Sequence, residues 1–427
     1  MTVVMPPNYR PLDETSLADY LAAQAELAAR LGGRAEDWRV REVGDGNLNL
    51  VFIVEGPDGD LCVKQALPYV RLVGESWPLP LARIVFEHRA MTLQARWAPR
   101  FVPAVYHFDP ELHLIVMERL HPHIIMRYGM IEGIVYPSFA EHLGEYLANT
   151  LYFSSDMALP AGEKKRLVKE FCDNTELCKI TEDLIFTDPY MVSERNRWTS
   201  PQLDPDAAAI RADAPLKLAV SELKLRFMRE TQALIHGDLH TGSIMVTRED
   251  SRVIDAEFAF FGPMGFDVGK LIGNLLMSYF SQAGHERQPG ERDAYRRWIL
   301  DTVEELWSGF ARRFTTLWSE HRTGDAYPEP LFADGEGERA FRLAQERFLR
   351  RLFVDSLGYA GCSMIRRTLG LAHNADMERI EDPDRRAACE RLNLALAREL
   401  IVHARHFTDI ADVTARARQL YARSARG

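Results

Sequence analysis

Cysteine is scarce in this 427-residue chain, which has five, an odd number. They lie at scattered positions, and no two have the paired spacing of a metal-binding motif: Cys62, Cys172, Cys178, Cys362 and Cys389. A disulfide framework is therefore not indicated, and we expect a reducing compartment. We assign none of these cysteines a catalytic role.

Long apolar runs and excess positive charge are also missing. No uninterrupted apolar stretch approaches membrane-spanning length, and the N-terminus MTVVMPPNYR lacks the charged and apolar regions of a signal peptide. The net charge of −10 argues against wide contact with nucleic acid or anionic membranes, although one local basic site can still bind phosphate. We expect a cytoplasmic protein without a nucleic-acid or membrane partner.

The chain is nevertheless rich enough in hydrophobic residues, at 46%, to bury a large core, and it is long enough for two or more lobes. Its first part predicts one helix over 17–31, capped by Thr15 or Ser16 and ended by Gly32 and Gly33. Five short runs with turn residues between them then predict an antiparallel sheet: 38–43, 50–55, 61–65, 104–108 and 113–117. Between them, we expect an irregular insertion over 70–83 and a helix from Arg83.

Beyond residue 118 the hydrophobic pattern is mainly helical. Loops are expected over 130–138 and 188–204, and Asp267 is expected to cap a helix. The predicted helices are 139–151, 206–230, 268–281, 291–322, 336–371, 385–406 and 411–423. The sequence thus indicates an α+β protein with a small antiparallel β lobe over 1–118 and a larger, mainly α-helical lobe over 119–427.

The most informative stretch is 236–267, which reads HGDLHTGSIMVTREDSRVIDAEFAFFGPMGFD. Two brief apolar runs, 243–246 and 252–254, predict a small hairpin. Asp238 precedes the first run, while Asp255 and Glu257 follow the second, so three carboxylates can converge. Crowded carboxylates repel one another, and a divalent cation relieves that repulsion. Each residue alone is more simply a capping or solvated acid, but all of them in this order indicate a site.

A His-x-Asp loop, a hairpin and an Asp-x-Glu segment in this order resemble the catalytic centre of the protein-kinase-like phosphotransferases. Gly237 stands where protein kinases have Arg, as in the aminoglycoside and choline kinase branch. Where that branch usually continues with Pro-Gly-Asn this chain has Thr241-Gly242-Ser243, and Asp255-Ala256-Glu257 stands where Asp-Phe-Gly is expected. This combination is similar to the 5-methylthioribose kinase family.

The resemblance implies a bilobal protein-kinase-like fold, a homodimer, and ATP- and Mg²⁺-dependent phosphorylation of the anomeric hydroxyl of 5-methylthioribose in methionine salvage. It implies that Asp238 orients the sugar hydroxyl and accepts its proton, and that Asp255 and Glu257 hold magnesium. Because an anomeric hydroxyl is more acidic than an ordinary alcohol, orientation is the larger expected contribution of Asp238. Ser243 stands at the position of a metal-binding Asn, and we expect Glu257 to take over that duty.

A nucleotide site is implied near the N-terminus. The connection Gly44-Asp45-Gly46-Asn47-Leu48-Asn49 is by itself an ordinary hairpin turn. Followed by a strand that bears Lys64, it resembles the glycine-rich phosphate loop and strand lysine of kinases. The same resemblance pairs Glu87 with Lys64 and assigns adenine binding to the backbone of a hinge that includes Glu118 and Leu120. Lys64 and Glu87 are otherwise exposed charges.

Three further residues are assigned to the sugar by resemblance. Trp77 lies in the irregular insertion, where this family carries a tryptophan-bearing loop, although a tryptophan also commonly anchors a loop to the core. Arg366 and Arg367 correspond to a twin arginine at the sugar site. As an exposed dipeptide they would be a solvated charge patch, but adjacent helical residues point about 100° apart, so at least one can turn inward.

Two other functions remain open. An aminoglycoside or choline kinase would share the transfer residues but should surround its cationic substrate with acidic or aromatic groups. A non-catalytic nucleotide-binding regulator would be expected to have lost Asp238, Asp255 or Lys64, and the chain has all three.

Overall fold

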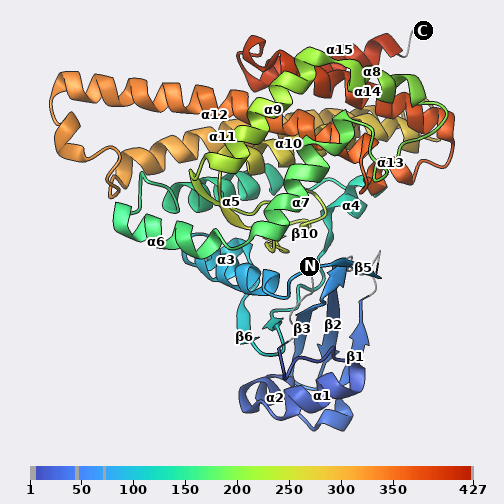
Figure 1. The fold of residues 1–427 in the computed structure, drawn as a ribbon, viewed down its shortest axis with the longest axis vertical. Helices are drawn as coiled ribbons and strands as arrows, with labels where there is room; N and C mark the ends of the chain where they lie inside the picture. The colour runs from blue at the N-terminus through green and yellow to red at the C-terminus, as the bar shows by residue number, and fades with distance from the viewer. Residues whose placement is uncertain (1–5, 44–47, 71–73, 425–427) are drawn as a thin grey trace.

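The computed structural model describes residues 6–43, 48–70 and 74–424. Its N-terminal part is built around a five-stranded antiparallel sheet, which Figure 1 shows below a larger helical part. The strand order is β1-β2-β3-β7-β6, with β1 Arg39–Glu42, β2 Asn49–Glu55, β3 Asp60–Ala66, β6 Val105–Asp109 and β7 Leu114–Met117. Each predicted strand is confirmed to within one residue at either end.

Side-chain alternation along β3 gives the sheet two covered faces. Leu61 and Val63 pack with α1 Glu14–Ala22 and α2 Ala25–Leu31 on one face, while Cys62 and Ala66 pack toward α3 Arg83–Trp97 on the other. Lys64 shares the α3 face because it lies two residues from each of these. Short 3-10 turns flank these elements, η1 Ala35–Asp37 and η2 Pro99–Phe101.

The single helix predicted over 17–31 was wrong in two respects. The chain forms two helices, separated at Ala23 and Gln24, and the first is capped by Asp13 instead of Thr15 or Ser16. The carboxylate of Asp13 accepts a hydrogen bond from the backbone N–H of Ser16 at 2.8 Å, and the hydroxyl of Ser16 accepts one from Asp13 at 2.9 Å. This reciprocal pair satisfies two N–H groups at once, which favours Asp13 as the cap. Gly32, with φ +68°, ends α2 as expected.

The segment expected to be irregular contains a small antiparallel hairpin, β4 Tyr69–Val70 and β5 Gly74–Pro78. Its irregular character is therefore only partly confirmed.

The larger part of the chain is mainly helical. Its helices are α4 Met126–Glu132, α5 Phe139–Phe153, α6 Ala161–Phe171, α7 Thr175–Phe186, η3 Asp188–Tyr190, α8 Asp204–Ala212, α9 Ala214–Arg229, α10 Met264–His285, α11 Asp293–Glu320, η4 Glu329–Phe332, α12 Gly335–Leu369, α13 Ala375–Glu378, α14 Pro383–Val402, η5 Ala404–His406 and α15 Ile410–Ser424. The expected α+β division into a small β part and a larger helical part is confirmed. The exact boundary at residues 118 and 119 stays a prediction.

Several helical predictions were wrong in detail. The run over 206–230 is broken at Asp213, whose carboxylate caps α9 by accepting from the N–H of Leu216 at 3.0 Å. Asp267 does not cap a helix, because α10 begins three residues earlier and Asp267 lies buried in its first turn. The loop over 130–138 begins inside α4, and α6 and α7 were not predicted.

Small strands hold the stretch over 236–267. The predicted hairpin is confirmed as β10 Ile244–Val246 and β11 Ser251–Val253. β8 Ile124–Ile125 adds to β10, and β9 Ala233–Ile235 pairs with β12 Phe260–Gly262. These three additional strands are two or three residues long and were not predicted.

Helices α10 and α12 pack with their backbones in close contact. A Cβ at Gly269 would lie 2.1 Å from the carbonyl oxygen of Ser356, and a Cβ at Gly273 would lie 2.8 Å from that of Ala360. On the other side of α12, a Cβ at Gly361 would lie 2.5 Å from a carbonyl oxygen of α14. The small residues of α12 therefore allow close helix approach, as expected, and they fix the position of its C-terminal turn.

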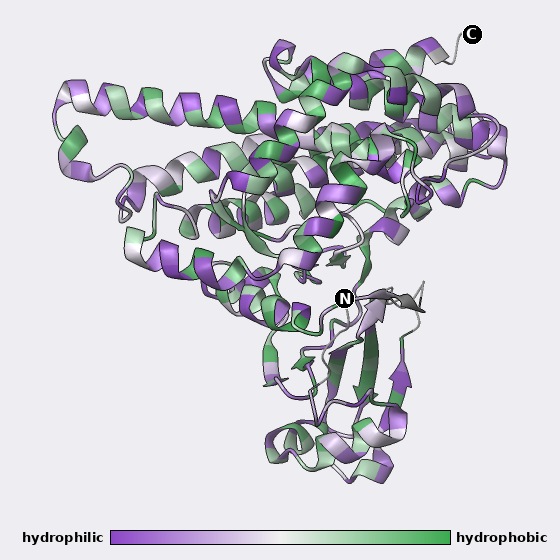
Figure 2. Cartoon of the chain, in the orientation of Figure 1, coloured by the Kyte–Doolittle hydropathy of each residue, from purple (hydrophilic) through white to green (hydrophobic). Residues whose placement is uncertain are grey.

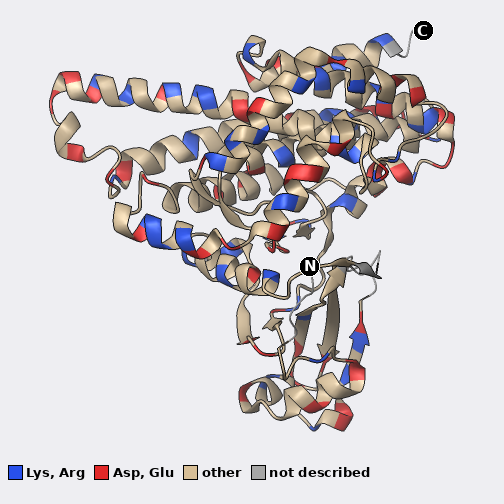
Figure 3. Cartoon of the chain, in the orientation of Figure 1, with Lys and Arg blue, Asp and Glu red and all other residues tan. Residues whose placement is uncertain are grey.

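The start of α12 projects with α11 from the body of the helical part (Figure 1). Hydrophilic and hydrophobic residues alternate along this projection, whereas the middle strands of the sheet are hydrophobic (Figure 2). Acidic and basic residues are interspersed along it (Figure 3). Within the described residues, no helix combines the length and the hydrophobicity needed to cross a bilayer.

Candidate active site

The loop between β9 and β10 carries Asp238 and is fixed by α10. The carboxylate of Asp267 accepts hydrogen bonds from the backbone N–H groups of His236 at 2.6 Å and Gly237 at 3.0 Å. Gly237 has φ +79°, and a Cβ at this position would lie 2.2 Å from the carbonyl oxygen of Phe258. Glycine is therefore required before Asp238, which explains why no arginine stands there.

Both carboxylate oxygens of Asp238 are engaged. Oδ1 forms an ion pair with Lys270 of α10, and Oδ2 lies 3.3 Å from Nε2 of His240. The N–H of Gly242 donates to Nδ1 of His240 at 3.0 Å, so Nε2 carries the proton and faces the carboxylate. Burial acts to raise the pKa of Asp238, but Lys270 and His240 outweigh it and hold that pKa well below its ordinary value. Burial also lowers the pKa of His240 to about 3, so its imidazole is neutral.

Ser243 supports this loop from within. Its hydroxyl donates to the backbone carbonyl of Asp238 at 2.9 Å and lies 3.1 Å from Nδ1 of His240. The side chain is buried. Ser243 therefore stabilises the loop conformation. Glu257, which was expected to bind metal in its place, lies with other carboxylates.

The predicted ion pair between Lys64 and Glu87 is confirmed, with an Nζ to Oε1 distance of 2.8 Å. Lys64 also pairs with Asp255, which follows β11. Burial acts to lower the pKa of Lys64, but Asp255 and Glu87 outweigh it and raise that pKa. Burial raises the pKa of Glu87 to about 7, with Lys64 acting in the opposite direction.

Three carboxylates converge beside Lys64. Oxygen atoms of Glu87, Asp255 and Glu257 lie within 4.8 Å of one another. Glu87 and Glu257 are buried, whereas Asp255 is partly exposed and has φ +71°. Carboxylate oxygens are the ligands that a hard divalent cation prefers. The donor set therefore fits the expected magnesium, but the third carboxylate of the cluster is Glu87 and not the expected Asp238, which pairs with Lys270 instead.

Glu257 is held by two residues of the N-terminal part. Its Oε2 accepts from Nδ2 of Asn49 at 2.9 Å and lies 3.4 Å from Nε of Arg83. Burial raises the pKa of Glu257, with Lys64 opposing it and Asp255 adding to it. Asn49 was predicted to bind ATP, but its side chain is buried and faces Glu257 and Arg83.

Arg83 is a residue that sequence reasoning missed, because it was noted only as the start of a helix. Its side chain is fully buried and gathers oxygen atoms from segments far apart in the chain. These acceptors are the carbonyl oxygens of Leu48 (2.8 Å), Leu67 (2.7 Å) and Pro80 (2.9 Å) and Oδ1 of Asn49 (2.7 Å). Arg83 thus fixes the end of the predicted phosphate loop. The other predicted loop residues, Gly44, Asp45, Gly46 and Asn47, lie outside the described residues.

The predicted hinge connects the two parts of the molecule. The N–H of Glu118 donates to the carbonyl of Ala104 at 2.8 Å, and Oε2 of Glu118 accepts from the N–H of Ala104 at 3.1 Å. Arg119 pairs with Glu55 at 2.6 Å. The side chain of Leu120 is partly buried. Adenine binding by Glu118 and Leu120 stays a prediction.

Arg366 and Arg367 lie in the last turn of α12. Their guanidinium groups donate to the carbonyl oxygen of Ala372, at 3.1 Å and 3.2 Å. Arg367 is buried and Arg366 partly so. Burial lowers the pKa of both arginines, and the charge of Asp238 acts against this effect at each of them. The structure therefore brings the predicted pair within electrostatic reach of Asp238, which spacing in the sequence did not reveal.

Trp77 lies on β5 and is partly buried. Its ring centroid is 5.8 Å from the guanidinium carbon of Arg195, which belongs to the helical part and pairs with Asp188 at 2.8 Å. The tryptophan therefore bridges the two parts of the molecule. Its assignment to the substrate stays a prediction.

Sequence reasoning also missed polar residues around Asp238. Lys270 follows Asp267 by three residues, so the two share a face of α10, and this spacing was visible in the sequence. His240 follows Asp238 by two residues. Arg127, by contrast, gave no local signal: it is the second residue of α4, lies 3.3 Å from Asp376 and donates to Oγ1 of Thr241 at 3.3 Å.

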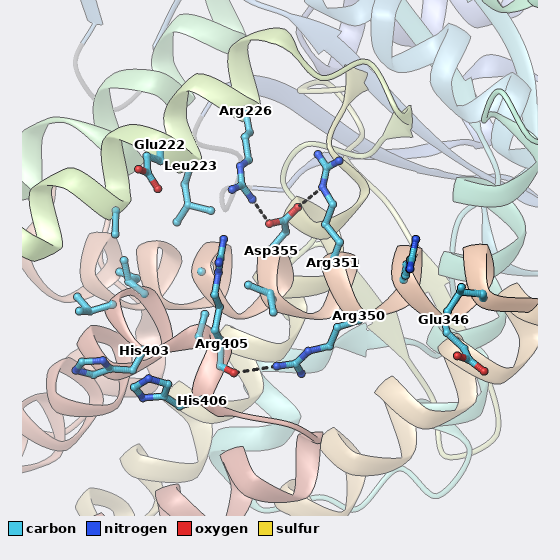
Figure 4. A pocket seen from close by; sticks show the side chains of 18 residues that line it. Glu222, Leu223, Arg226, Glu346, Arg350, Arg351, Asp355, His403, Arg405 and His406 are labelled. Carbon is cyan, nitrogen blue, oxygen red and sulfur yellow. Dashed lines mark hydrogen bonds and ion pairs between the residues drawn. The ribbon is translucent and has the colours of Figure 1, made fainter. Parts of the chain in front are cut away.

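A cavity of about 980 Å³ opens elsewhere, between α9, α12 and residues 401–406 (Figure 4). Its charges are partly neutralised within the chain, because Asp355 pairs with both Arg226 and Arg351. Arg350 donates to the carbonyl of Arg405 at 2.9 Å. None of the predicted site residues is among those that line this cavity.

Comparison with known proteins identifies the family of this chain. Residues 39–310 match the phosphotransferase enzyme family, APH. Methylthioribose kinase 1 of Oryza sativa subsp. japonica is 48% identical, covering 95% of this chain and 94% of the rice protein. Methylthioribose kinases of Escherichia coli O45:K1 and Geobacillus kaustophilus are 46% and 42% identical, each covering at least 96% of this chain and 98% of the relative. The chain belongs to the methylthioribose kinase family, within the phosphotransferase enzyme family.

Proposed function

We propose that this protein transfers the γ-phosphoryl group of ATP to the anomeric hydroxyl of 5-methylthioribose, giving the 1-phosphate in methionine salvage. The observation that carries the proposal is the convergence of Asp238 with Arg366 and Arg367, close to the Lys64–Asp255 pair, in a member of this family. The choice of 5-methylthioribose as the acceptor rests on the names of the relatives.

Asp238 orients the acceptor hydroxyl in this proposal. Its depressed pKa makes it a weak base, which suits an anomeric hydroxyl because such a hydroxyl needs little help to lose its proton. Orientation next to the phosphoryl donor is then the main contribution.

The nucleotide lies between the two parts of the molecule in this proposal. Lys64, positioned by Glu87, contacts its phosphates, and the loop that ends at Leu48 and Asn49 covers them. Asp255 and Glu257 hold Mg²⁺, whose charge would neutralise the phosphate oxygens. The hinge at Glu118 and Leu120 receives the adenine.

Arg366 and Arg367 supply planar donors for the sugar hydroxyls, and Trp77 covers the sugar. A cationic acceptor is disfavoured here, because Arg127 and Lys270 add further positive charge around Asp238. An aminoglycoside or choline kinase is therefore the less favoured alternative.

The test is an acceptor panel with ATP and Mg²⁺ that includes 5-methylthioribose, an aminoglycoside and choline. We expect ADP release and a sugar 1-phosphate with 5-methylthioribose alone, and none with the Asp238→Asn variant. If an amine-bearing acceptor reacted and 5-methylthioribose did not, the kinase assignment would stand and this substrate would be abandoned.

We also propose a cytoplasmic homodimer, as the family resemblance implies. An exposed apolar stripe on α9 supports the dimer: Leu218, Leu225 and Met228 are 64%, 53% and 58% exposed and share a helical face. Beside it, the cavity of Figure 4 carries both Glu346 and Arg347, so a second copy related by two-fold symmetry can pair acid with base. Sedimentation velocity should show a dimer that Leu225→Glu dissociates. A monomeric parent protein, or a dimeric variant, would remove this face from the assembly.

A further inference from the structure

Lys270 occupies an unusual position for a lysine. Its side chain is buried on α10, its Nζ pairs with Oδ1 of Asp238, and the ring centroid of Phe266 lies 5.1 Å from the ammonium. Burial lowers the pKa of Lys270 to about 8, with Asp238 opposing this effect and Arg366 and Arg367 adding to it. The ammonium is thus held in a place that already has an excess of positive charge.

A buried ammonium at this position is unfavourable for the stability of the fold. A buried ion pair loses the hydration of both charges, and an apolar residue of similar size commonly serves stability as well or better. The surroundings suit such a residue, since α10 is buried along most of its length. Stability alone therefore does not account for a lysine here, whereas contact with Asp238 does.

The two donors on Asp238 differ in kind. His240 is neutral and belongs to the same loop, so it moves with Asp238 whenever that loop moves. Lys270 is cationic and comes from α10, which is fixed against α12 by the close approach at Gly269 and Gly273. Of these two donors, Lys270 is therefore the one that ties the carboxylate to a rigid element outside the loop.

We infer that Lys270 is a positioning residue for phosphoryl transfer, which holds Oδ1 of Asp238 from α10 so that the carboxylate stays ionised and aimed at the acceptor hydroxyl. Each carboxylate oxygen can accept more than one hydrogen bond, so Asp238 can keep Lys270 and His240 while it accepts from the substrate. The inference rests on the proposed phosphoryl transfer at Asp238 and is independent of which acceptor is used.

Other charges act on the same pair. Asp238 is influenced by Arg367, Arg366 and Arg127 and itself acts on Asp255, while Lys270 also acts on Asp267. These groups remain when Lys270 is replaced. Replacement of Lys270 therefore removes the cation in direct contact with Oδ1 of Asp238 and leaves these other charges unchanged.

The test compares Lys270→Met and Lys270→Arg with the parent enzyme over a range of pH, using whichever acceptor the parent phosphorylates. Without the ammonium the pKa of Asp238 rises, so the acid limb of the kcat/KM profile should move to higher pH by about one unit. At pH values below that limb, kcat of Lys270→Met should be at least about tenfold lower than kcat of the parent enzyme. ATP binding should change little. Lys270→Arg should restore most of kcat and the original limb.

Lys164→Met is a matched control. Lys164 is also buried in the helical part, with its pKa lowered by burial to about 8, and it donates to the carbonyl of Gln232 at 2.7 Å. Its loss should affect thermal stability without moving the pH profile. A Lys270→Met enzyme with unchanged kcat and pH profile would overturn the inference, as would a uniform loss at every pH that arginine does not rescue.

A second measurement needs no turnover, so it separates this inference from the proposed substrate. The pKa of Lys270 can be followed by NMR of ¹³C-methylated lysines in the full-length protein. It should fall in Asp238→Asn, because the variant loses the only anion paired with this ammonium in the described residues. An unchanged pKa would show that the contact does not exist in solution, even if 5-methylthioribose is phosphorylated.

Discussion

Replacement of Arg83 by methionine should destabilise the N-terminal part and loosen the predicted phosphate loop. Methionine fills similar volume but leaves buried oxygens of Leu48, Leu67, Pro80 and Asn49 without their donor. It also removes one of the two cations that act on Glu257 in this pocket. Breaking a buried pair from one side costs about 3–5 kcal/mol.

We take on the order of 3–5 kcal/mol as the expected loss in free energy of unfolding, because the orphaned neutral oxygens and the unpaired charge are not additive. This is a large fraction of the roughly 5–15 kcal/mol typical of a folded protein. Urea unfolding without nucleotide or metal measures it directly. ATP affinity should fall as well, since Leu48 and Asn49 lose their anchor.

Two further variants, Glu257→Gln alone and Glu257→Gln combined with Arg83→Met, test whether the loss comes from the buried ion pair. Glu257→Gln alone should cost less than Arg83→Met, because Arg83 keeps four neutral acceptors. In the double variant part of the loss should disappear, because no carboxylate is left unpaired. If Arg83→Met lost less than about 1 kcal/mol, or if Glu257→Gln did not relieve the loss, the reasoning from the buried pair would be refuted.

The pH dependence provides a further check. Burial already raises the pKa of Glu257, and removal of Arg83 should raise it more. A carboxyl group whose pKa is higher in the folded state contributes stability at low pH and loses that contribution as pH rises through the folded pKa. Arg83→Met should therefore be more destabilising at about pH 8 than at about pH 5. The double variant should show no such difference.

Four further substitutions probe the site. Asp238→Asn is nearly isosteric but cannot accept a proton, so phosphorylation should be abolished with ATP binding intact; near-native turnover would remove Asp238 from the mechanism. Asp255→Asn should weaken the affinity for the Mg²⁺-nucleotide complex, because the metal site loses a negative charge. Asn tolerates the φ of +71° at this position, so the effect would not come from backbone strain. An unchanged metal titration would contradict the assignment. Arg366→Lys or Arg367→Lys should lower kcat/KM for the sugar about tenfold to a hundredfold with little change for ATP, since a lost hydrogen bond from a charged donor is worth about 1.5–3 kcal/mol. Normal sugar kinetics in both variants would exclude the pair from substrate binding.

The sheet was predictable because its signal is local. Alternating residues in β2 and β3, with turn residues between them, define each strand without reference to the rest of the chain. The same holds for the β10–β11 hairpin and for the order of Asp238, Asp255 and Glu257 along it. Those features depend on neighbours a few residues away.

The missed elements depend on distant partners. β8 is two residues long and exists because it pairs with β10, about 120 positions further along the chain. Asp267 resembles a helix cap in the sequence, but the N–H groups that it satisfies belong to His236 and Gly237, on a loop 30 positions earlier. Arg83 likewise looks like an ordinary first helical residue, although its hydrogen-bond acceptors lie on three separate segments. Local propensity carries no information about such partners.

Helix α3 explains why the two parts of the molecule act as one site despite their separate cores. Ile84 and Met91 pack into the cluster under the sheet, whereas Phe86 and Ala90 pack with Phe171 and other residues of the helical part. Glu87 lies between these two contacts and is buried. Its ion pair with Lys64 therefore cannot open unless α3 leaves one of its two apolar clusters. Because Lys64 also pairs with Asp255, a movement of the sheet that displaces Lys64 must disturb Asp255 as well, and a nucleotide that binds at Lys64, as proposed, would act on Asp255 through the same pair.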